Sequence, residues 1–249
     1  MSDRTPPTVA QYGVVALLSV TFLPAVLKIA VQVALKPLFD SSASIAISVF
    51  LVAEAVILAA LIYLLGSREA PFRWSTVIPY QKSVHPFVFI VLLAAVTAYA
   101  IYFRDFFRWM PLMDWAGFVR ETVTFWPPEW LRLRFQFDQP DAAASTRIGL
   151  LAFGMIAIGT ASAMQTLYFR GFVLPRMEYL GWAAPFANTV LFVVFHTNSP
   201  EFWHLFFIFT LGWGIVVYAT RNVWIAVTSH VIFNTYSFGP AIFELAAAE

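Results

Sequence analysis

The side chains that could do chemistry lie in the C-terminal part of the chain, inside apolar stretches. The run FVVFH ends at His196, and the run HVIFN begins at His230 and ends at Asn234. Phe192 and His196 are four residues apart, as are His230 and Asn234, so each pair shares one face of a helix. Arg170, at the end of QTLYFR, is a further polar group among apolar residues. Two imidazoles, an amide and a guanidinium in consecutive apolar segments indicate a polar site.

One chemistry open to such a site is hydrolysis. Histidines can hold a water or an oxyanion, the Asn234 amide can donate to developing negative charge, and a carboxylate must accept the proton of the water. The alternative is binding of haem, or of a divalent metal such as zinc, by the neutral imidazoles of His196 and His230. Haem is disfavoured because neither histidine lies in a glycine-rich segment. An interhelical hydrogen bond would explain either pair alone, but two pairs together with Arg170 favour a functional site.

The composition places these elements in a membrane. Of the 249 residues, 60% are hydrophobic and 12% are charged, and the mean hydropathy is +0.75. A soluble fold of this length could not bury so much apolar surface. The net charge of +1 gives no indication of nucleic-acid binding. Because the chain has no cysteine, disulfides, thiolate metal sites and cysteine nucleophiles are excluded.

The fold class that follows is an all-α, polytopic membrane bundle. Stretches long enough to cross a bilayer, at about 20 residues each, predict about seven transmembrane helices, at 12–37, 43–66, 86–104, 147–170, 183–197, 203–220 and 223–239. The tryptophan-rich segment 105–146 predicts interfacial helices in the headgroup layer, with an ordinary structured loop as the alternative. We expect one integral membrane domain, in which residues 1–146 supply the N-terminal helices and the interfacial segment.

Two ionisable residues lie deep in the first two predicted spans, Lys28 in LPAVLKIAVQV and Glu54 in FLVAEAVILAA. Charges inside a membrane usually pair with one another, which predicts an ion pair between adjacent helices. The alternative is that Glu54 is a buried acid available for proton transfer. The sequence leaves both open.

In order and spacing, the motifs resemble those of the CPBP family. This is the CAAX-protease and bacteriocin-processing group of intramembrane endopeptidases, also called the Abi family. The family pattern is EExxxR, FxxxH and HxxxN on successive membrane helices, and the matching stretches here are QTLYFR (165–170), FVVFH (192–196) and HVIFN (230–234). The resemblance covers about residues 147–238, a CPBP-like core. It implies a buried site in which the first glutamate activates a water, two histidines position that water or bind a metal, and the asparagine helps to form an oxyanion hole.

The sequence departs from the family pattern at both acids, since Gln165 and Thr166 stand where the pattern has two glutamates. Gln165 can hold a water through its carbonyl, but it cannot accept a proton, so a general base worth about 10²–10⁴ in rate is missing. Glutamine is also a poor metal ligand. Thr166 precedes Arg170 by one α-helical turn and offers it no charge. The candidate partners for Arg170 are Glu178, an interfacial phosphate, or backbone carbonyls at a helix end.

Two functions are compatible with this pattern. The first is an intramembrane endopeptidase that hydrolyses peptide bonds of membrane-associated CAAX-type or bacteriocin-like substrates, with a relocated base such as Glu54 or Glu201. The second is a catalytically inactive family member that acts as a membrane adaptor or peptide-binding protein. Retention of the histidines and the asparagine favours the first function, and loss of both acids favours the second. The candidate catalytic residues are Gln165, Thr166, Arg170, His196, His230 and Asn234, and a metal would bind at His196 and His230.

The expected partners are the lipid bilayer and a membrane-associated peptide or protein substrate. We expect an integral protein of the cell (plasma) membrane of a prokaryote. An N-terminus inside the cell puts a slight excess of basic residues on the cytoplasmic side. Those residues are Arg4, Arg68, Arg73, Lys82, Arg170, Arg176 and Arg221.

Overall fold

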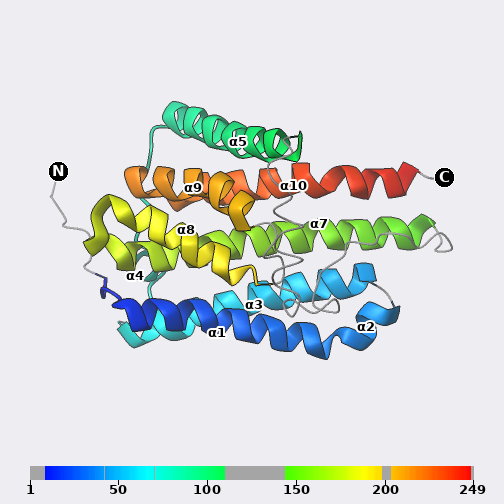
Figure 1. The fold of residues 1–249 in the computed structure, drawn as a ribbon, viewed down its shortest axis with the longest axis horizontal. Helices are drawn as coiled ribbons and strands as arrows, with labels where there is room; N and C mark the ends of the chain where they lie inside the picture. Colours follow the sequence, from blue (N-terminus) through cyan, green and yellow to red (C-terminus); the bar gives the residue numbers. More distant parts are fainter. Residues whose placement is uncertain (1–8, 42, 70, 110–143, 198–202, 248–249) are drawn as a thin grey trace.

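A computed structural model describes residues 9–41, 43–69, 71–109, 144–197 and 203–247 (Figure 1). Over these residues the chain is helical apart from short connections and an isolated bridge between Gln81 and Asn222. The α-helices are α1 (Val14–Ala34), α2 (Lys36–Ser41), α3 (Ala43–Glu69), α4 (Trp74–Val77), α5 (Pro86–Trp109), α7 (Ala144–Thr166), α8 (Ala184–Phe195), α9 (Trp203–Thr220) and α10 (Val223–Ala247). Between α7 and α8 the chain forms a π-helix, η2 (Leu167–Val173), and a 3₁₀ segment, η3 (Leu174–Ala183).

The helices are those of an integral membrane protein. Among the described residues, five helical stretches are long and apolar enough to cross a bilayer: 14–34, 48–69, 86–106, 154–195 and 203–220. The fourth stretch joins the spans predicted at 147–170 and 183–197 into 42 continuous residues. At Gly181 the backbone leaves the helical conformation, with φ at 55°, a region that glycine enters without steric cost. The predicted interfacial segment lies largely at 110–143, outside the described residues.

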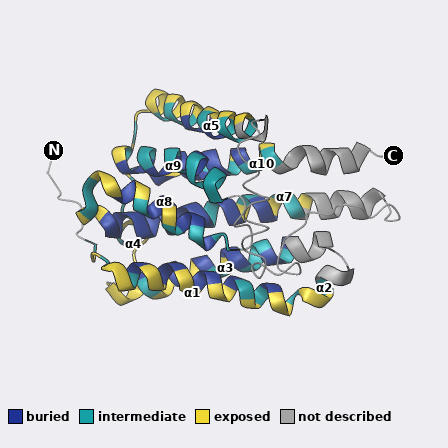
Figure 2. Cartoon of the chain, viewed as in Figure 1, coloured by how far each residue is buried: buried dark blue, intermediate teal, exposed yellow. Residues whose placement is uncertain are grey.

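Helix α7 occupies the middle of the bundle. It packs against α3 on one side and α10 on the other, while α5 and α8 both pack on α9 (Figure 1). The N-terminal helices therefore share one core with the C-terminal ones. Buried residues lie where these helices face one another, and exposed residues follow their outer faces (Figure 2).

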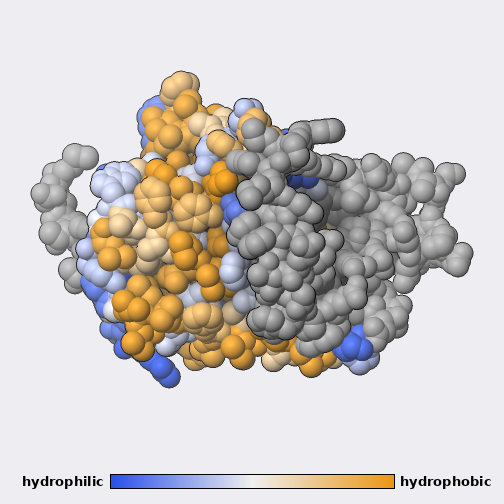
Figure 3. Space-filling view, in the orientation of Figure 1, coloured by the Kyte–Doolittle hydropathy of each residue, from blue (hydrophilic) through white to orange (hydrophobic). Residues whose placement is uncertain are grey.

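The outer faces are apolar. Val15, Phe87 and Ile156 are each more than 60% exposed. Hydrophobic residues cover most of the described part of the face in Figure 3, and hydrophilic residues lie mainly at its edges. Since an aqueous solvent would disfavour this surface, its natural environment is the hydrocarbon core of a bilayer.

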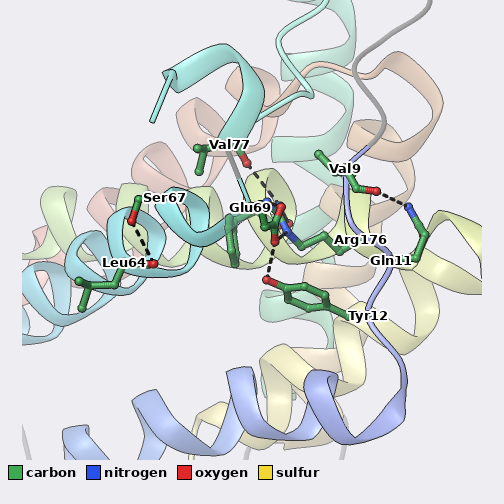
Figure 4. Close-up of polar contacts among 9 residues, drawn as sticks. Val9, Gln11, Tyr12, Leu64, Ser67, Glu69, Val77 and Arg176 are labelled. Atoms are coloured by element: carbon green, nitrogen blue, oxygen red, sulfur yellow. Dashed lines mark hydrogen bonds and ion pairs between the residues drawn. The ribbon is translucent and has the colours of Figure 1, made fainter. Parts of the chain in front are cut away.

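A cluster of polar side chains ties the bundle together at the end where α1 begins (Figure 4). The guanidinium of Arg176 is fully buried and donates from Nε and Nη2 to the two carboxylate oxygens of Glu69, at 2.9 and 2.7 Å. The hydroxyl of Tyr12 donates to the same carboxylate at 2.8 Å, and its backbone N–H donates to the Arg176 carbonyl at 3.0 Å. These contacts hold the segment before α1 against the ends of α3 and η3.

Candidate functional site

The polar positions of QTLYFR lie where the helix changes its winding. Gln165 and Thr166 are the last residues of α7, and Arg170 lies in the π-helix η2 that follows. The i→i+5 hydrogen bonding of a π-helix makes a wider turn than an α-helix. The spacing of four residues had led us to expect Arg170 on the same face as Thr166, but the two side chains contact different helices. Thr166 contacts α10, whereas Arg170 contacts α8 and α9.

His230 is held on both ring nitrogens. Its Nδ1 lies 2.9 Å from the Thr166 hydroxyl and its Nε2 lies 3.1 Å from the Asn234 amide nitrogen. Thr166 donates its hydroxyl proton to the Ser162 carbonyl, at 3.0 Å, so it accepts from His230. The Asn234 amide also donates to the Ser162 hydroxyl, at 2.7 Å, and that hydroxyl donates to the Ile158 carbonyl, at 2.7 Å.

These directions assign one tautomer to the ring. His230 is neutral, carries its proton on Nδ1 and accepts at Nε2, because an amide nitrogen can only donate. Both amide hydrogens of Asn234 are in use, one on His230 and one on Ser162. The sequence motif predicted the helix face shared by His230 and Asn234, but it did not predict Ser162. The signal for Ser162 is its position four residues before Thr166, on the same face of α7.

His196 directly follows the last residue of α8. Its Nδ1 lies 2.9 Å from the Phe192 carbonyl oxygen, so the neutral ring donates from Nδ1 and presents a lone pair at Nε2. The Phe192 ring lies between the two histidines, with its centroid 4.7 Å from that of His196 and 6.1 Å from that of His230. The motif residues of α8 and α10 therefore converge on one aromatic ring.

A carboxylate from another helix contacts Gln165. Glu54, in the middle of α3, accepts a short hydrogen bond from the Gln165 amide through Oε1. Its Oε2 lies 3.1 Å from Nζ of Lys28, and the side chains of Glu54 and Lys28 are only 2% and 4% exposed. The predicted ion pair between the first two membrane helices is thus confirmed. The contact between Glu54 and Gln165 was not predicted, because it depends on how α3 packs on α7.

Arg170 is buried without a carboxylate among the described residues. It donates to the side-chain oxygen of Asn188 through a short hydrogen bond. Further contacts, each at 3.3 Å, reach the Asn188 carbonyl, the Thr189 hydroxyl and the Thr210 carbonyl. The guanidinium also lies 5.0 Å from the centroid of the Phe192 ring. Asn188 was missed by sequence reasoning, although it is a polar position four residues before Phe192 in the apolar helix α8.

The partners expected for Arg170 need correction. Glu178 lies 2.6 Å from both Arg221 and the Tyr80 hydroxyl, so it is engaged elsewhere. The carbonyls that Arg170 reaches belong to the interiors of α8 and α9 and not to a helix end. Since Arg170 is only 1% exposed, it also does not belong with the basic residues of a cytoplasmic loop.

The described residues do not suit a resident metal. They contain no group of three or more His, Cys, Asp or Glu side chains that could hold a metal ion. Both nitrogens of His230 are hydrogen-bonded, which leaves no lone pair for a metal or a haem in this arrangement. The ammonium of Lys28 beside Glu54 would also repel a cation. No step through a metal follows from these residues. The other relocated acid considered, Glu201, lies outside the described residues.

Comparison with known proteins identifies the C-terminal part of the chain. Residues 147–236 match the family model described as type II CAAX prenyl endopeptidase Rce1-like. The searches of curated proteins and of solved structures found no match. The matched residues include all three motifs, and they form the part of the bundle in which Thr166, His230 and Asn234 are joined by hydrogen bonds. This similarity, over about a third of the chain, supports the resemblance to the CPBP family of CAAX-protease-like integral membrane proteins.

Proposed function

We propose that the chain is an intramembrane endopeptidase that hydrolyses peptide bonds in membrane-associated proteins or peptides of CAAX or bacteriocin type. The observation that carries the proposal is a polar cluster inside an apolar bundle: Thr166, His230 and Asn234 are joined by hydrogen bonds, and Gln165, next to Thr166 in the chain, is hydrogen-bonded to Glu54. A polar side chain in a membrane interior costs free energy, so it is found there mainly where it has a function. The family resemblance adds the class of reaction.

In this proposal each retained motif residue has a role that its contacts allow. His196 holds the attacking water through Nε2, because its Nδ1 is engaged by the Phe192 carbonyl. The Asn234 amide turns one hydrogen from His230 Nε2 to the substrate carbonyl oxygen as negative charge develops there. The hydrogen bond to Thr166 keeps the His230 ring in place during that exchange.

A second candidate is a non-catalytic membrane adaptor that binds a peptide in the same place. It is favoured by the closed hydrogen-bond network around His230, which is complete without water or substrate. The adaptor function is also favoured by the presence of Gln165 and Thr166 where the family motif has two acids.

A cleavage assay separates the two candidates. The chain is reconstituted in liposomes with quenched fluorescent peptides, one a farnesylated CAAX peptide and one an unprenylated apolar peptide. We expect cleavage that falls by at least about 10²-fold in His230→Ala, while His85→Ala, remote from the cluster, keeps full activity. Suppose instead that the unmodified chain binds peptide without cleaving it, and that only Gln165→Glu with Thr166→Glu cleaves. The adaptor function is then correct and the endopeptidase proposal is wrong.

The membrane and orientation form part of the same proposal: the cell membrane of a prokaryote, with the N-terminus inside. The end of the bundle where α1 begins carries exposed basic side chains, among them Arg68 and Arg73. Since the chain has no cysteine, single cysteines report the orientation directly. On intact cells an impermeant maleimide should label Lys36→Cys but not Lys82→Cys, and the reverse pattern would show the opposite orientation.

A further inference from the structure

We propose that Glu54, from outside the family motifs, is the general base of this site, and that Lys28 and Gln165 position it. The inference rests on the proposed endopeptidase function. Gln165 occupies the place of the first motif acid, and the Glu54 carboxylate is hydrogen-bonded to its side chain. The charge that the motif lacks is thus supplied by α3 across the interface between α3 and α7.

The Glu54 carboxylate has one committed oxygen and one that can react. Oε1 accepts the hydrogen bond from Gln165. Oε2 is buried and in ionic contact with Lys28, yet it accepts no hydrogen bond from the described residues. A buried carboxylate oxygen normally gains a hydrogen-bond donor, from protein or from water. Oε2 is therefore the position at which a nucleophilic water would donate its proton.

The ion pair also connects the two parts of the motif site. Nζ of Lys28 lies 4.5 Å from the ring centroid of Phe195, the residue before His196. On the other side, Gln165 precedes Thr166, which holds His230. Glu54 thus lies between the segment that carries His196 and the segment that orients His230. Lys28 supplies the opposite charge beside the buried carboxylate and fixes its position.

The reaction balances with water as the only added reactant. The water oxygen bonds to the carbonyl carbon of the substrate, its proton passes to Oε2 of Glu54, and the carbonyl electron pair moves to oxygen. When the tetrahedral intermediate collapses, the carbon–nitrogen bond breaks and protonated Glu54 returns its proton to the leaving amine. The product acid then releases its own proton to solvent, and Glu54 is again ionised beside Lys28.

A purely structural ion pair would make different demands on the residues. It would become dispensable once both charges are removed, so Lys28→Met/Glu54→Gln would still be active. A general base needs a carboxylate within reach of the water, and that carboxylate can be at position 54 or on the neighbouring side chain at position 165. Exchanging the two side chains, as in Glu54→Gln with Gln165→Glu, therefore tests the role of the carboxylate while the composition of the pair stays the same.

The experiment measures kcat and KM for the farnesylated CAAX peptide in proteoliposomes. Glu54→Gln should lower kcat by about 10²–10⁴ with little change in KM. The exchanged double variant should recover to within about tenfold of the unmodified chain. Glu69→Gln is the matched control, because Glu69 is also an ion-paired acid of α3 but lies at the end of the bundle; its kcat should not change. Lys28→Met should lower kcat, and Lys28→Arg should restore most of it.

The outcomes distinguish this inference from the function on which it rests. If Glu54→Gln retains kcat while His230→Ala abolishes cleavage, the base is elsewhere and the endopeptidase function stands. If the unmodified chain cleaves neither peptide, both proposals fail. Should Glu54→Gln not fold, Lys28→Met/Glu54→Gln removes both charges, and adding Gln165→Glu to it returns only the carboxylate. Cleavage by the triple variant but not by the double supports the inference, and equal activity of the two overturns it.

Discussion

Replacing one or both members of the Lys28–Glu54 pair should reveal how much the bundle depends on it. The two charged atoms are 3.1 Å apart, and both side chains are at least 96% buried. At an effective dielectric constant of about 20, this separation corresponds to an attraction of about 5 kcal/mol. Desolvation of the two ions opposes this attraction, so the net contribution of the pair is small. Loss of one partner leaves the other with the desolvation cost alone.

The size of that cost has an upper bound. A buried side chain that has lost its partner can avoid the desolvation cost of its charge by changing its protonation state. At pH 7 this costs an ordinary lysine side chain about 4.6 kcal/mol and an ordinary glutamate about 3.7 kcal/mol. We therefore expect Glu54→Gln to lower the free energy of unfolding by about 3–4.5 kcal/mol, slightly more than Lys28→Met does. The double variant should fall within about 2 kcal/mol of the unmodified chain, because neither position 28 nor position 54 then carries a buried charge.

The assay is reversible unfolding in mixed micelles, followed by circular dichroism for the unmodified chain, both single variants and the double variant. The quantity of interest is the coupling energy, which should exceed about 3 kcal/mol. Additive effects, with a coupling near zero, would refute the idea that the two charges neutralise each other inside the bundle. The double variant also serves the catalytic test, since it should be folded and inactive.

Three other predictions concern the end of the bundle and its packing. Arg176→Met should cost about 3 kcal/mol in unfolding free energy, because it leaves the Glu69 carboxylate unpaired; an unchanged denaturation midpoint would contradict this. Burial and the hydrogen bond to Glu69 raise the pKa of Tyr12 to about 12. The stability that the neutral phenol contributes is therefore complete below about pH 10 and is lost as the pH rises toward 12. The advantage of the unmodified chain over Tyr12→Phe in thermal unfolding should shrink over that interval, and a constant difference would count against the hydrogen bond. Gly66→Ala places a methyl 2.6 Å from a valine methyl of α4 and should cost about 1–3 kcal/mol. In Gly13→Ala the added methyl meets nothing within 4 Å, so this variant should shift stability by less than about 0.5 kcal/mol. Equal effects of the two substitutions would show that α4 moves aside to accommodate the methyl at position 66.

The sequence alone determined the solvent and the fold class, and its motifs indicated the family resemblance. An apolar chain with so few charges can satisfy its backbone in lipid only as helices or a closed barrel, and the runs of apolar residues select helices. The spacing of His230 and Asn234 gave their shared face, because four residues make about one turn of any α-helix. The cost of leaving either charge alone in a membrane predicted the pairing of Lys28 with Glu54 as one of two alternatives.

Only the tertiary structure decided which groups meet across helices. Arg170 contacts Asn188 of α8 whereas Thr166 contacts His230 of α10, and the spacing of the two residues in the sequence does not predict these partners. The position of Glu54 against Gln165 depends on the register between α3 and α7, two helices separated by many residues. Because packing against neighbouring helices sets rotation and tilt, a carboxylate absent from its motif could be supplied from another helix without any trace in the motif itself.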